Sequence, residues 1–239
     1  GRHERRRQMQ QQAANWDDAG AGETGLPAHE LIYRRLREMI LFGDLTPGQA
    51  VTIQGLTAEL GAGMTPVREA IRRLTSQGAL EFQGNRRVSV PLLKAGDIDE
   101  MIVAREWLDP YLIRRAALAV SADQADHLAE IDTALDLAIR RGDLRAYLKG
   151  NYEFHMMLYA LAASPLLAEL AEGLWLRFGP SMRVVCGLMG TQNLPDNHKA
   201  AIEALRAADA DAAAEAIGRD VRQGMEQLRL SLEPPVAAS

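Results

Sequence analysis

The stretch Asn151–His155, NYEFH, places a carboxamide and an imidazole four residues apart in a segment with helical periodicity. On an α-helix this spacing puts both side chains on one face, one turn apart. An amide oxygen and an imidazole nitrogen can bind a metal ion or hydrogen-bond a small ligand. The spacing alone leaves open whether the pair belongs to a ligand site or lies on a solvated surface.

Two further polar residues interrupt apolar helical patterns toward the C-terminus. His198 begins a segment with helical periodicity, and Asp220 lies between Ile217 and Val221 in another. His155 is flanked by apolar residues, so we expect it to face inward or to lie at the boundary of the core. Taken one at a time, these side chains have ordinary structural roles, because a buried histidine more often hydrogen-bonds than binds metal and Asp220 could pair with an arginine.

The composition is that of a globular protein rich in helix. Of the 239 residues, 47% are hydrophobic and 25% are charged, enough for one large domain or two modest ones. Aromatic residues make up only 5%, whereas Ala, Leu and Arg abound, which favours helix over strand. The single cysteine excludes an internal disulfide, and no apolar run approaches the roughly 20 residues of a membrane span. These features predict a cytoplasmic protein with no membrane partner.

Charge is unevenly distributed, although its total is only −5. Residues 29–95 carry nine Lys and Arg against six Asp and Glu, whereas residues 96–239 carry 14 against 22. A basic front section and an acidic remainder indicate two domains with different partners. The segment 1–27 is polar, lacks periodicity and has no signal-peptide core, so we predict a disordered arm.

Residues 28–92 are predicted to form a winged helix-turn-helix. Helical periodicity predicts three helices, over residues 31–43, 54–60 and 66–78. Thr65 is the expected N-cap of the third helix, with Pro66 at its first position. Two short strands are expected to follow around a Gly84–Asn85 turn. Three helices and a basic hairpin are the layout of this motif.

The third helix of such a motif enters the major groove of double-stranded DNA by its N-terminal end, and basic residues elsewhere neutralise phosphates. The candidate DNA-binding residues are those exposed on this helix and at the hairpin tip: Thr65, Arg68, Arg72, Gly84, Asn85, Arg86 and Arg87. The alternative for the arginines is a solvated helix face on which Glu69 pairs with Arg73. The complete helix–turn–helix–hairpin frame favours DNA binding.

The motifs G-D-L-T-P-G, L-T-A-E-L-G and T-P-V-R-E-A-I-R-R-L follow one another in this section. In order and spacing they resemble the DNA-binding domain of the GntR family of bacterial transcription regulators. The resemblance implies that Arg68 contacts phosphates and bases. Where the family usually has an arginine before the Thr-Pro pair this sequence has Met64, and where some relatives have one before Gly55 it has Gln54. Met64 and Gln54 both belong to the candidate DNA-binding residues, and we expect the operator to differ from the usual operator of the family.

Residues 96–232 are predicted to form an all-α bundle, so the fold class is mainly α. Helices are expected over residues 97–120, 122–141, 143–162, 164–189, 196–208 and 210–231. The second of them shows helical spacing at Ile131, Leu135 and Ile139. Ser121 and Asp143 are expected N-caps. Helical bundles build ligand sites in the core from facing side chains.

Four motifs of this bundle resemble the FCD ligand-binding domain of FadR-type GntR regulators, namely R-E-W-L-D at 105–109, N-Y-E-F-H at 151–155, N-H-K-A-A-I-E-A-L at 197–205 and A-A-D-A-D-A-A-A-E-A-I-G-R-D-V at 207–221. In many members a D-x-x-x-H motif and two later histidines ligate one divalent metal. The matching positions here are Asn151, His155, His198 and Asp220. Asn151 stands for the usual aspartate, and Asp220 stands for the usual last histidine.

Two imidazoles, one carboxylate and one amide carbonyl can bind Zn²⁺, Ni²⁺ or Mn²⁺ and leave positions open for water or an effector. The charge of Asp220 restores the one that Asn151 gives up. The alternative is a metal-free pocket in which the same side chains hydrogen-bond an effector directly. The resemblance also implies a ligand-facing cation at Arg105, suited to a carboxylate effector, with Asp109 in place of the family's neighbouring glutamate.

The two domains together predict a homodimeric transcription regulator, and we expect a repressor. It would bind a pseudo-palindromic operator and respond to a small carboxylate metabolite that shifts the spacing of its two DNA-binding domains. One alternative is a regulator that senses the metal ion itself. Another is a metal-dependent hydrolase with His155, His198 and Asp220 around an activated water. No general base is placed beside this set and no nucleophile motif occurs, so we do not expect an enzyme.

Overall fold

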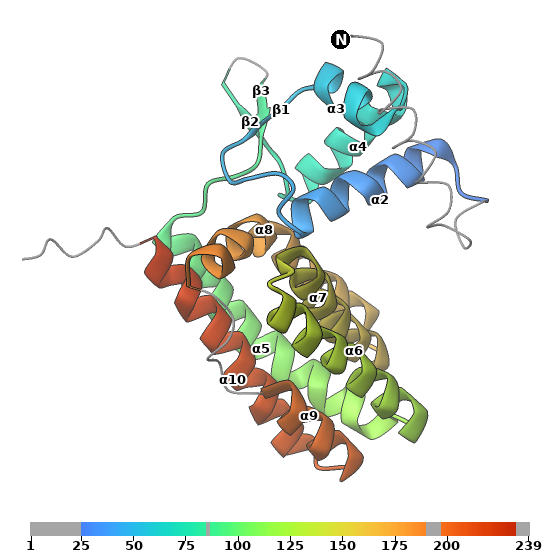
Figure 1. Ribbon diagram of the computed structural model, residues 1–239, viewed down its shortest axis with the longest axis vertical. Coiled ribbons are helices and arrows are strands. Elements are labelled where there is room, and N and C mark those ends of the chain that lie inside the picture. The colour runs from blue at the N-terminus through green and yellow to red at the C-terminus, as the bar shows by residue number, and fades with distance from the viewer. Residues whose placement is uncertain (1–24, 85–86, 190–196, 233–239) are drawn as a thin grey trace, which may run out of the picture. The chain divides into compact units, whose positions relative to one another are not determined.

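The computed structural model describes residues 25–84, 87–189 and 197–232 (Figure 1). They divide into two compact units. The first contains the chain up to Glu38 together with Ala50–Ser89, and the second contains Met39–Gln49 and the chain from Val90 onward. Within the described ranges, no helix is both long and apolar enough to cross a membrane. Of the predicted arm, residues 1–24 lie outside the described part.

The predicted winged helix-turn-helix is confirmed. Its helices are α2 (Ala28–Leu41), α3 (Ile53–Leu60) and α4 (Met64–Ser76), and its strands are β1 (Ala50–Val51), β2 (Glu81–Gln83) and β3 (Arg87–Ser89). The strands form an antiparallel sheet in the order β1-β3-β2. Strand β1 was not predicted, because two residues are too few to show alternation. The apolar face of α4 is buried, with Val67, Ala70, Ile71 and Leu74 in the core of the unit.

The start of α4 differs from the prediction. The helix begins at Met64, and Gly63 is its N-cap, with φ −73°, ψ 162° and no side-chain hydrogen bond to the first turn. Thr65, the predicted N-cap, is therefore the second helical residue and Pro66 the third. Glycine is an accepted N-cap, which permits the earlier start. Pro66 still fits, because the first amides of a helix have no partner inside it.

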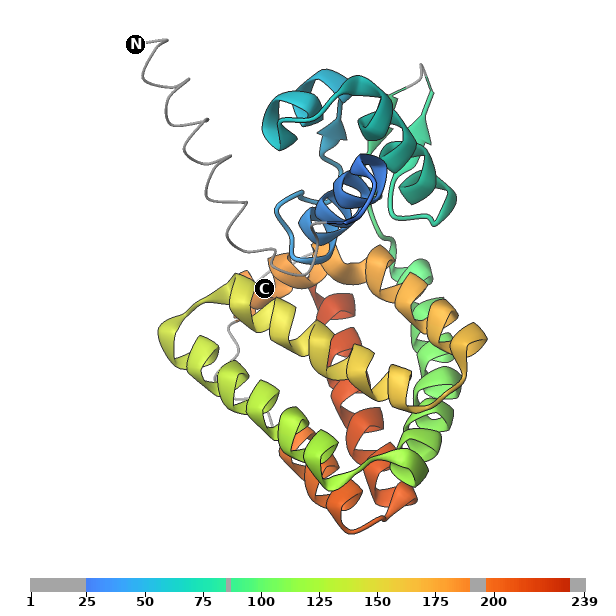
Figure 2. The ribbon, with the colours of Figure 1, turned by 90° about the vertical axis from the view of Figure 1, so that its right-hand side faces the viewer.

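The second unit is an all-α bundle, as predicted. Its helices are α5 (Ala95–Ala119), α6 (Ala122–Arg141), α7 (Leu144–Leu161), α8 (Pro165–Met189), α9 (Asn197–Arg206) and α10 (Ala210–Ser231). Ser121 caps α6 and Asp143 caps α7, because their side chains accept hydrogen bonds from the amides of Gln124 and Ala146. Helix α10 packs on α5, α8 and α9 and lies centrally in Figure 2.

The buried face of α6 differs from the pattern expected at Ile131, Leu135 and Ile139. Ile131 and Ile139 are only half-buried. The buried residues are instead Ala125, Leu128, Asp132, Leu135 and Ala138. A carboxylate therefore occupies a core position on this helix, and α6 packs on α7 and α9 with that face.

The end of α2 and the turn after it belong to the second unit and pack on α8 and α7. A Cβ atom on Gly179 of α8 would lie 3.0 Å from the carbonyl oxygen of Leu41 and 3.1 Å from its Cα atom. The two backbones therefore meet closely, and any larger residue at position 179 would push Leu41 back by a few tenths of an ångström. The ring of Phe42 packs edge-on against Tyr152 of α7, with centroids 5.8 Å apart. Gly43 turns the chain away with φ +73°, in the left-handed region that favours glycine.

Candidate ligand and metal site

Three of the predicted metal ligands meet in the second unit. His155 lies on α7, His198 in the first turn of α9 and Asp220 on α10. Nε2 of His155 is 2.8 Å from Oδ2 of Asp220, and Nε2 of His198 is 3.3 Å from the same oxygen. One nitrogen or oxygen of each residue lies within 4.8 Å of the others. Helix packing thus brings together side chains that are far apart in the sequence.

The two histidines have different surroundings. His198 stacks on Phe154, with ring centroids 4.1 Å apart and planes 7° from parallel. Its Nδ1 is 3.5 Å from Oδ1 of Asp132, the carboxylate buried on α6, so it has a carboxylate near each ring nitrogen. His155 is 1% exposed, and its Nδ1 has no hydrogen-bond partner in the part of the chain that the structure describes.

The charges within this cluster follow from these contacts. Burial alone would lower the pKa of His198, but Asp220 and Asp132 outweigh burial and raise it to about 10. For His155, burial lowers the pKa, and the contact with Asp220 offsets this only in part. Burial would raise the pKa of Asp220, but the two imidazoles hold it below its usual range. At neutral pH the cluster therefore holds a cationic His198, a neutral His155 and a carboxylate.

The donor set fits a divalent transition metal. Two Nε2 atoms and a carboxylate oxygen converge, and Zn²⁺ binds such atoms at about 2.0–2.2 Å. The contact between Asp132 and Nδ1 of His198 is the type of support that orients a metal-binding imidazole. Asn151, one turn before His155 on α7, lines a pocket together with His155 and Asp220 and offers an amide oxygen. Metal and proton compete for His198, since a ligating imidazole must be neutral.

Arg105 of α5 is a buried cation with a fixed position. It is 5% exposed, and its Nε donates a hydrogen bond of 3.2 Å to Oδ2 of Asp109. The guanidinium carbon lies 5.0 Å from the ring centroid of Trp175 and 4.7 Å from that of Phe178. Asp109 also accepts a hydrogen bond from the hydroxyl of Tyr159. One carboxylate therefore pairs with Arg105 while two rings hold the guanidinium plane.

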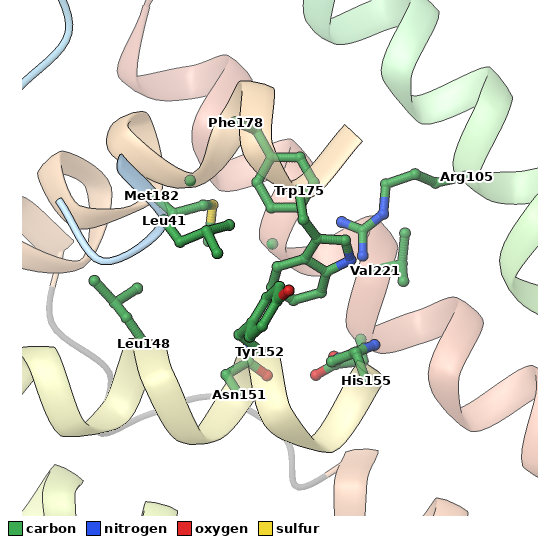
Figure 3. A pocket seen from close by; sticks show the side chains of 13 residues that line it. Leu41, Arg105, Leu148, Asn151, Tyr152, His155, Trp175, Phe178, Met182 and Val221 are labelled. Carbon is green, nitrogen blue, oxygen red and sulfur yellow. The ribbon is translucent and has the colours of Figure 1, made fainter. Parts of the chain in front are cut away.

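A pocket joins Arg105 to the histidine cluster (Figure 3). Its polar lining includes Arg105, Asn151, His155 and Asp220. The apolar lining includes Leu41, Leu148, Trp175, Phe178, Met182 and Val221. The cavity measures about 40 Å³, whereas one water needs roughly 10–15 Å³. Two predicted effector-binding residues, Asp109 and His198, are not part of the lining. Asp109 contacts Arg105 and His198 contacts Asp220, which do line the pocket.

Several residues of this site were not predicted from the sequence. Asp132 had a detectable signal, because it lies four residues after Leu128 and three before Leu135, on the apolar face of its helix. The sequence gives no such signal for Leu41 and Tyr159, because an apolar or aromatic residue in a helix usually belongs to the core. Their positions at the pocket and at the ion pair result from tertiary packing.

In the first unit, the arginines of α4 are exposed. Arg72 donates a 3.1 Å hydrogen bond to Glu69, and Arg73 pairs with Glu30 of α2 at 2.9 Å. The pairing of Glu69 with Arg73, which we considered as an alternative, is therefore replaced by other pairs. Arg68 has no hydrogen-bond or ion-pair partner among the described residues, which leaves its guanidinium available to a ligand.

The other predicted DNA-binding residues occupy three places in this unit. Gln54 is exposed in the first turn of α3, and Met64 and Thr65 are exposed at the start of α4. Gly84 and Arg87 are exposed on either side of the hairpin tip. The two tip residues between them, Asn85 and Arg86, lie outside the described residues.

Comparison with known proteins places both units. Residues 28–90 match the model of bacterial regulatory proteins of the gntR family, and residues 100–223 match that of the FCD domain. The chain is 26% identical over 193 residues to the HTH-type transcriptional regulator McbR of Escherichia coli strain K12, covering 80% of this chain and 87% of McbR. It is 25% identical over 179 residues to a probable D-xylose utilization operon transcriptional repressor of Paenarthrobacter nicotinovorans, covering 75% and 79%.

Solved structures share the fold. The structure of E. coli McbR/YncC matches with a TM-score of 0.81 at 24% identity, over 87% of this chain and 100% of that chain. A GntR transcriptional regulator from Rhodococcus sp. RHA1 matches with a TM-score of 0.72 at 20% identity, over 86% and 99%. Both likenesses extend over the two units.

Proposed function

This chain belongs to the GntR family of bacterial transcription regulators and carries an FCD domain. We propose that a small organic acid bound in the helical domain controls its binding to DNA. The family and its relatives make the chain a DNA-binding regulator, not an enzyme. Because it acts on bacterial DNA, its place of action is the cytoplasm.

Arg105 is the observation that carries the acid proposal. Among the described residues, the only hydrogen bond of its guanidinium is the one from Nε to Asp109. The terminal nitrogens therefore remain available at the wall of the pocket. A planar guanidinium binds a carboxylate through two parallel hydrogen bonds, and the low polarity of the site strengthens them. A cavity of about 40 Å³ limits the acid to a few heavy atoms unless the walls move.

We also propose that His155, His198, Asp220 and Asn151 hold a divalent transition ion such as Zn²⁺, Ni²⁺ or Mn²⁺. A bound ion would supply a Lewis-acid position for a ligand oxygen. The chain's own residues fix the acid: Arg105 binds its carboxylate, and the apolar lining excludes water. In the metal-free version, His155 hydrogen-bonds the acid itself, and a chelator has no effect on the affinity for the acid.

A second copy of the chain is the partner that we propose for an exposed apolar face on α5. The large apolar residues of this face are Val103, Trp107, Tyr111 and Leu118, at 58%, 79%, 48% and 84% exposure. They recur at helical spacing along one stripe, and a monomer gains nothing from exposing them. A twofold dimer would cover the stripe and match a pseudo-palindromic operator. Trp107→Glu should therefore shift the protein from dimer to monomer in light scattering, whereas an unchanged mass would contradict this face.

Thermal unfolding in a series of carboxylates, with and without chelator, tests the acid proposal. We expect one class of acid to raise the melting temperature of the wild type. The double variant Arg105→Met/Asp109→Leu removes the binding cation without leaving a buried charge, and no acid should stabilise it. Equal stabilisation of the variant, or none of the wild type, would contradict the role of Arg105.

The alternative candidate is a regulator that senses the ion itself. It is supported by the closed geometry of the cluster, in which the ligand atoms already lie within 4.8 Å of one another. Such a regulator would change its affinity for operator DNA with metal alone. The acid-responsive regulator needs the organic ligand in addition, so titration of DNA binding with metal and acid separately distinguishes the two.

A further inference from the structure

We propose that Leu41, the last residue of α2, contacts the apolar end of the acid and transmits its binding to the winged helix-turn-helix. The inference rests on the proposed acid site and adds the residue that selects the length of the acid.

Helix α2 is shared between the two units. Its residues up to Glu38 belong to the winged helix-turn-helix, whereas Met39–Leu41 belong to the helical bundle. The helix is continuous across this division, with each turn hydrogen-bonded to the next. A displacement of its last turn is therefore passed along the helix rather than absorbed by a flexible linker.

Leu41 and Arg105 lie at opposite ends of the pocket in Figure 3. Leu148 of α7 and Met182 of α8 accompany Leu41 at the apolar end. An acid whose carboxylate binds Arg105 must direct the rest of its chain toward this end. The chemistry of the two ends thus selects a small acid with one carboxylate and a short apolar chain.

The backbone of Leu41 has no room to retreat. Gly179 of α8 brings its own backbone against the carbonyl and Cα of Leu41, so even a Cβ atom would lie only 3.0 Å away. The next residue, Phe42, is held between the ring of Tyr152 and the guanidinium of Arg145, 5.6 Å from its centroid. Close-packed contacts of this kind change in discrete steps rather than gradually.

Most buried leucines only fill space, and Leu41 is 4% exposed. Leu148 provides the comparison, because it is also buried, lines the same pocket and differs in belonging to α7. If pocket volume alone mattered, truncation of either residue would have the same consequences. If α2 transmits binding, only truncation at Leu41 should separate acid binding from DNA binding.

The experiment uses straight-chain monocarboxylates from acetate to hexanoate and the full-length wild type, Leu41→Ala and Leu148→Ala. Calorimetry gives the affinity for each acid, and fluorescence anisotropy gives the affinity for upstream promoter DNA with and without acid. Both truncations should favour longer acids, by about fourfold per added methylene. In the wild type and Leu148→Ala the acid should change DNA affinity by about 5–150-fold, as is usual for coupled sites. In Leu41→Ala this factor should fall toward one.

Equal coupling in Leu41→Ala and Leu148→Ala would overturn the inference and leave the acid site intact. If no acid binds the wild type, or if Arg105→Met/Asp109→Leu binds acids equally well, the acid site fails and the inference fails with it. Leu41→Val removes a single methylene and keeps the test valid should the alanine variant not fold. It should show coupling between the two extremes, and wild-type coupling with unchanged chain-length preference would count against Leu41.

Discussion

The substitution Asp109→Leu tests how strongly the buried ion pair supports the bundle. Asp109 is 1% exposed and accepts hydrogen bonds from Arg105 and Tyr159. Its removal leaves the guanidinium of Arg105 buried without an anion, a change that costs about 3–5 kcal/mol. The rings of Trp175 and Phe178 still face the guanidinium and stabilise it by about 1–2 kcal/mol. The loss of stability should therefore lie near the lower end of the range of about 3–5 kcal/mol. We predict a loss of about 3 kcal/mol in the free energy of unfolding, and a melting temperature lower by about 6–12 °C.

The double variant Arg105→Met/Asp109→Leu should recover most of this loss. It leaves no unpaired charge, and apolar replacement of a whole buried pair is often neutral. We therefore expect it to unfold within about 1 kcal/mol of the wild type. Urea unfolding followed by far-ultraviolet circular dichroism measures both variants, and the single variant Arg105→Met completes the cycle that isolates the coupling between the two residues.

A matched control comes from an exposed pair. Asp126 contacts Arg206 at 2.7 Å, but the two side chains are 59% and 47% exposed. Asp126→Leu should cost no more than about 1 kcal/mol, because solvent screens such pairs. The reasoning would be refuted if Asp109→Leu were no more costly than this control, or if the double variant were as unstable as the single one.

Three further predictions concern the cluster and the thiol. Asp132→Asn should weaken metal binding by about 10–100-fold in calorimetry, because it removes the carboxylate beside Nδ1 of His198. Lys199 contacts both Asp132 and Asp136, so Asp136→Asn, which changes a carboxylate on the same lysine, is the matched control and should leave metal binding unchanged. Asn151→Asp should strengthen metal binding, since a carboxylate is a better donor than an amide, and an unchanged affinity would exclude residue 151 as a ligand. Burial raises the pKa of the Cys186 thiol to about 11, so it should react with a disulfide reagent at pH 8 far more slowly in the folded protein than in urea, and equal rates would contradict its burial.

The order and extent of the helices could be predicted from the sequence because periodicity and capping act over a few residues. Ser121 and Asp143 cap the helices predicted for them. The predicted start of α4 was wrong, because Thr65 and Gly63 are both acceptable N-caps and local chemistry does not choose between them. The two-residue strand β1 exists only because Val51 pairs with Val88, a partner distant in the sequence.

The candidate site was predictable in part. His155, His198 and Asp220 were selected through a family resemblance, and their convergence depends on the packing of three helices. Asp132 could have been selected from the apolar face of its helix. Leu41 could not, because its place in the pocket depends on the close approach that Gly179 allows.

Control of DNA binding by an acid in the pocket at Arg105 can be measured directly. The direct measurement is the dissociation constant for upstream promoter DNA, determined by fluorescence anisotropy with and without the acid that most raises the melting temperature. We predict that saturating acid changes this constant by about 5–150-fold in the wild type, and leaves it unchanged in Arg105→Met/Asp109→Leu. An unchanged constant in the wild type at saturating acid, or an equal change in the double variant, would contradict the claim.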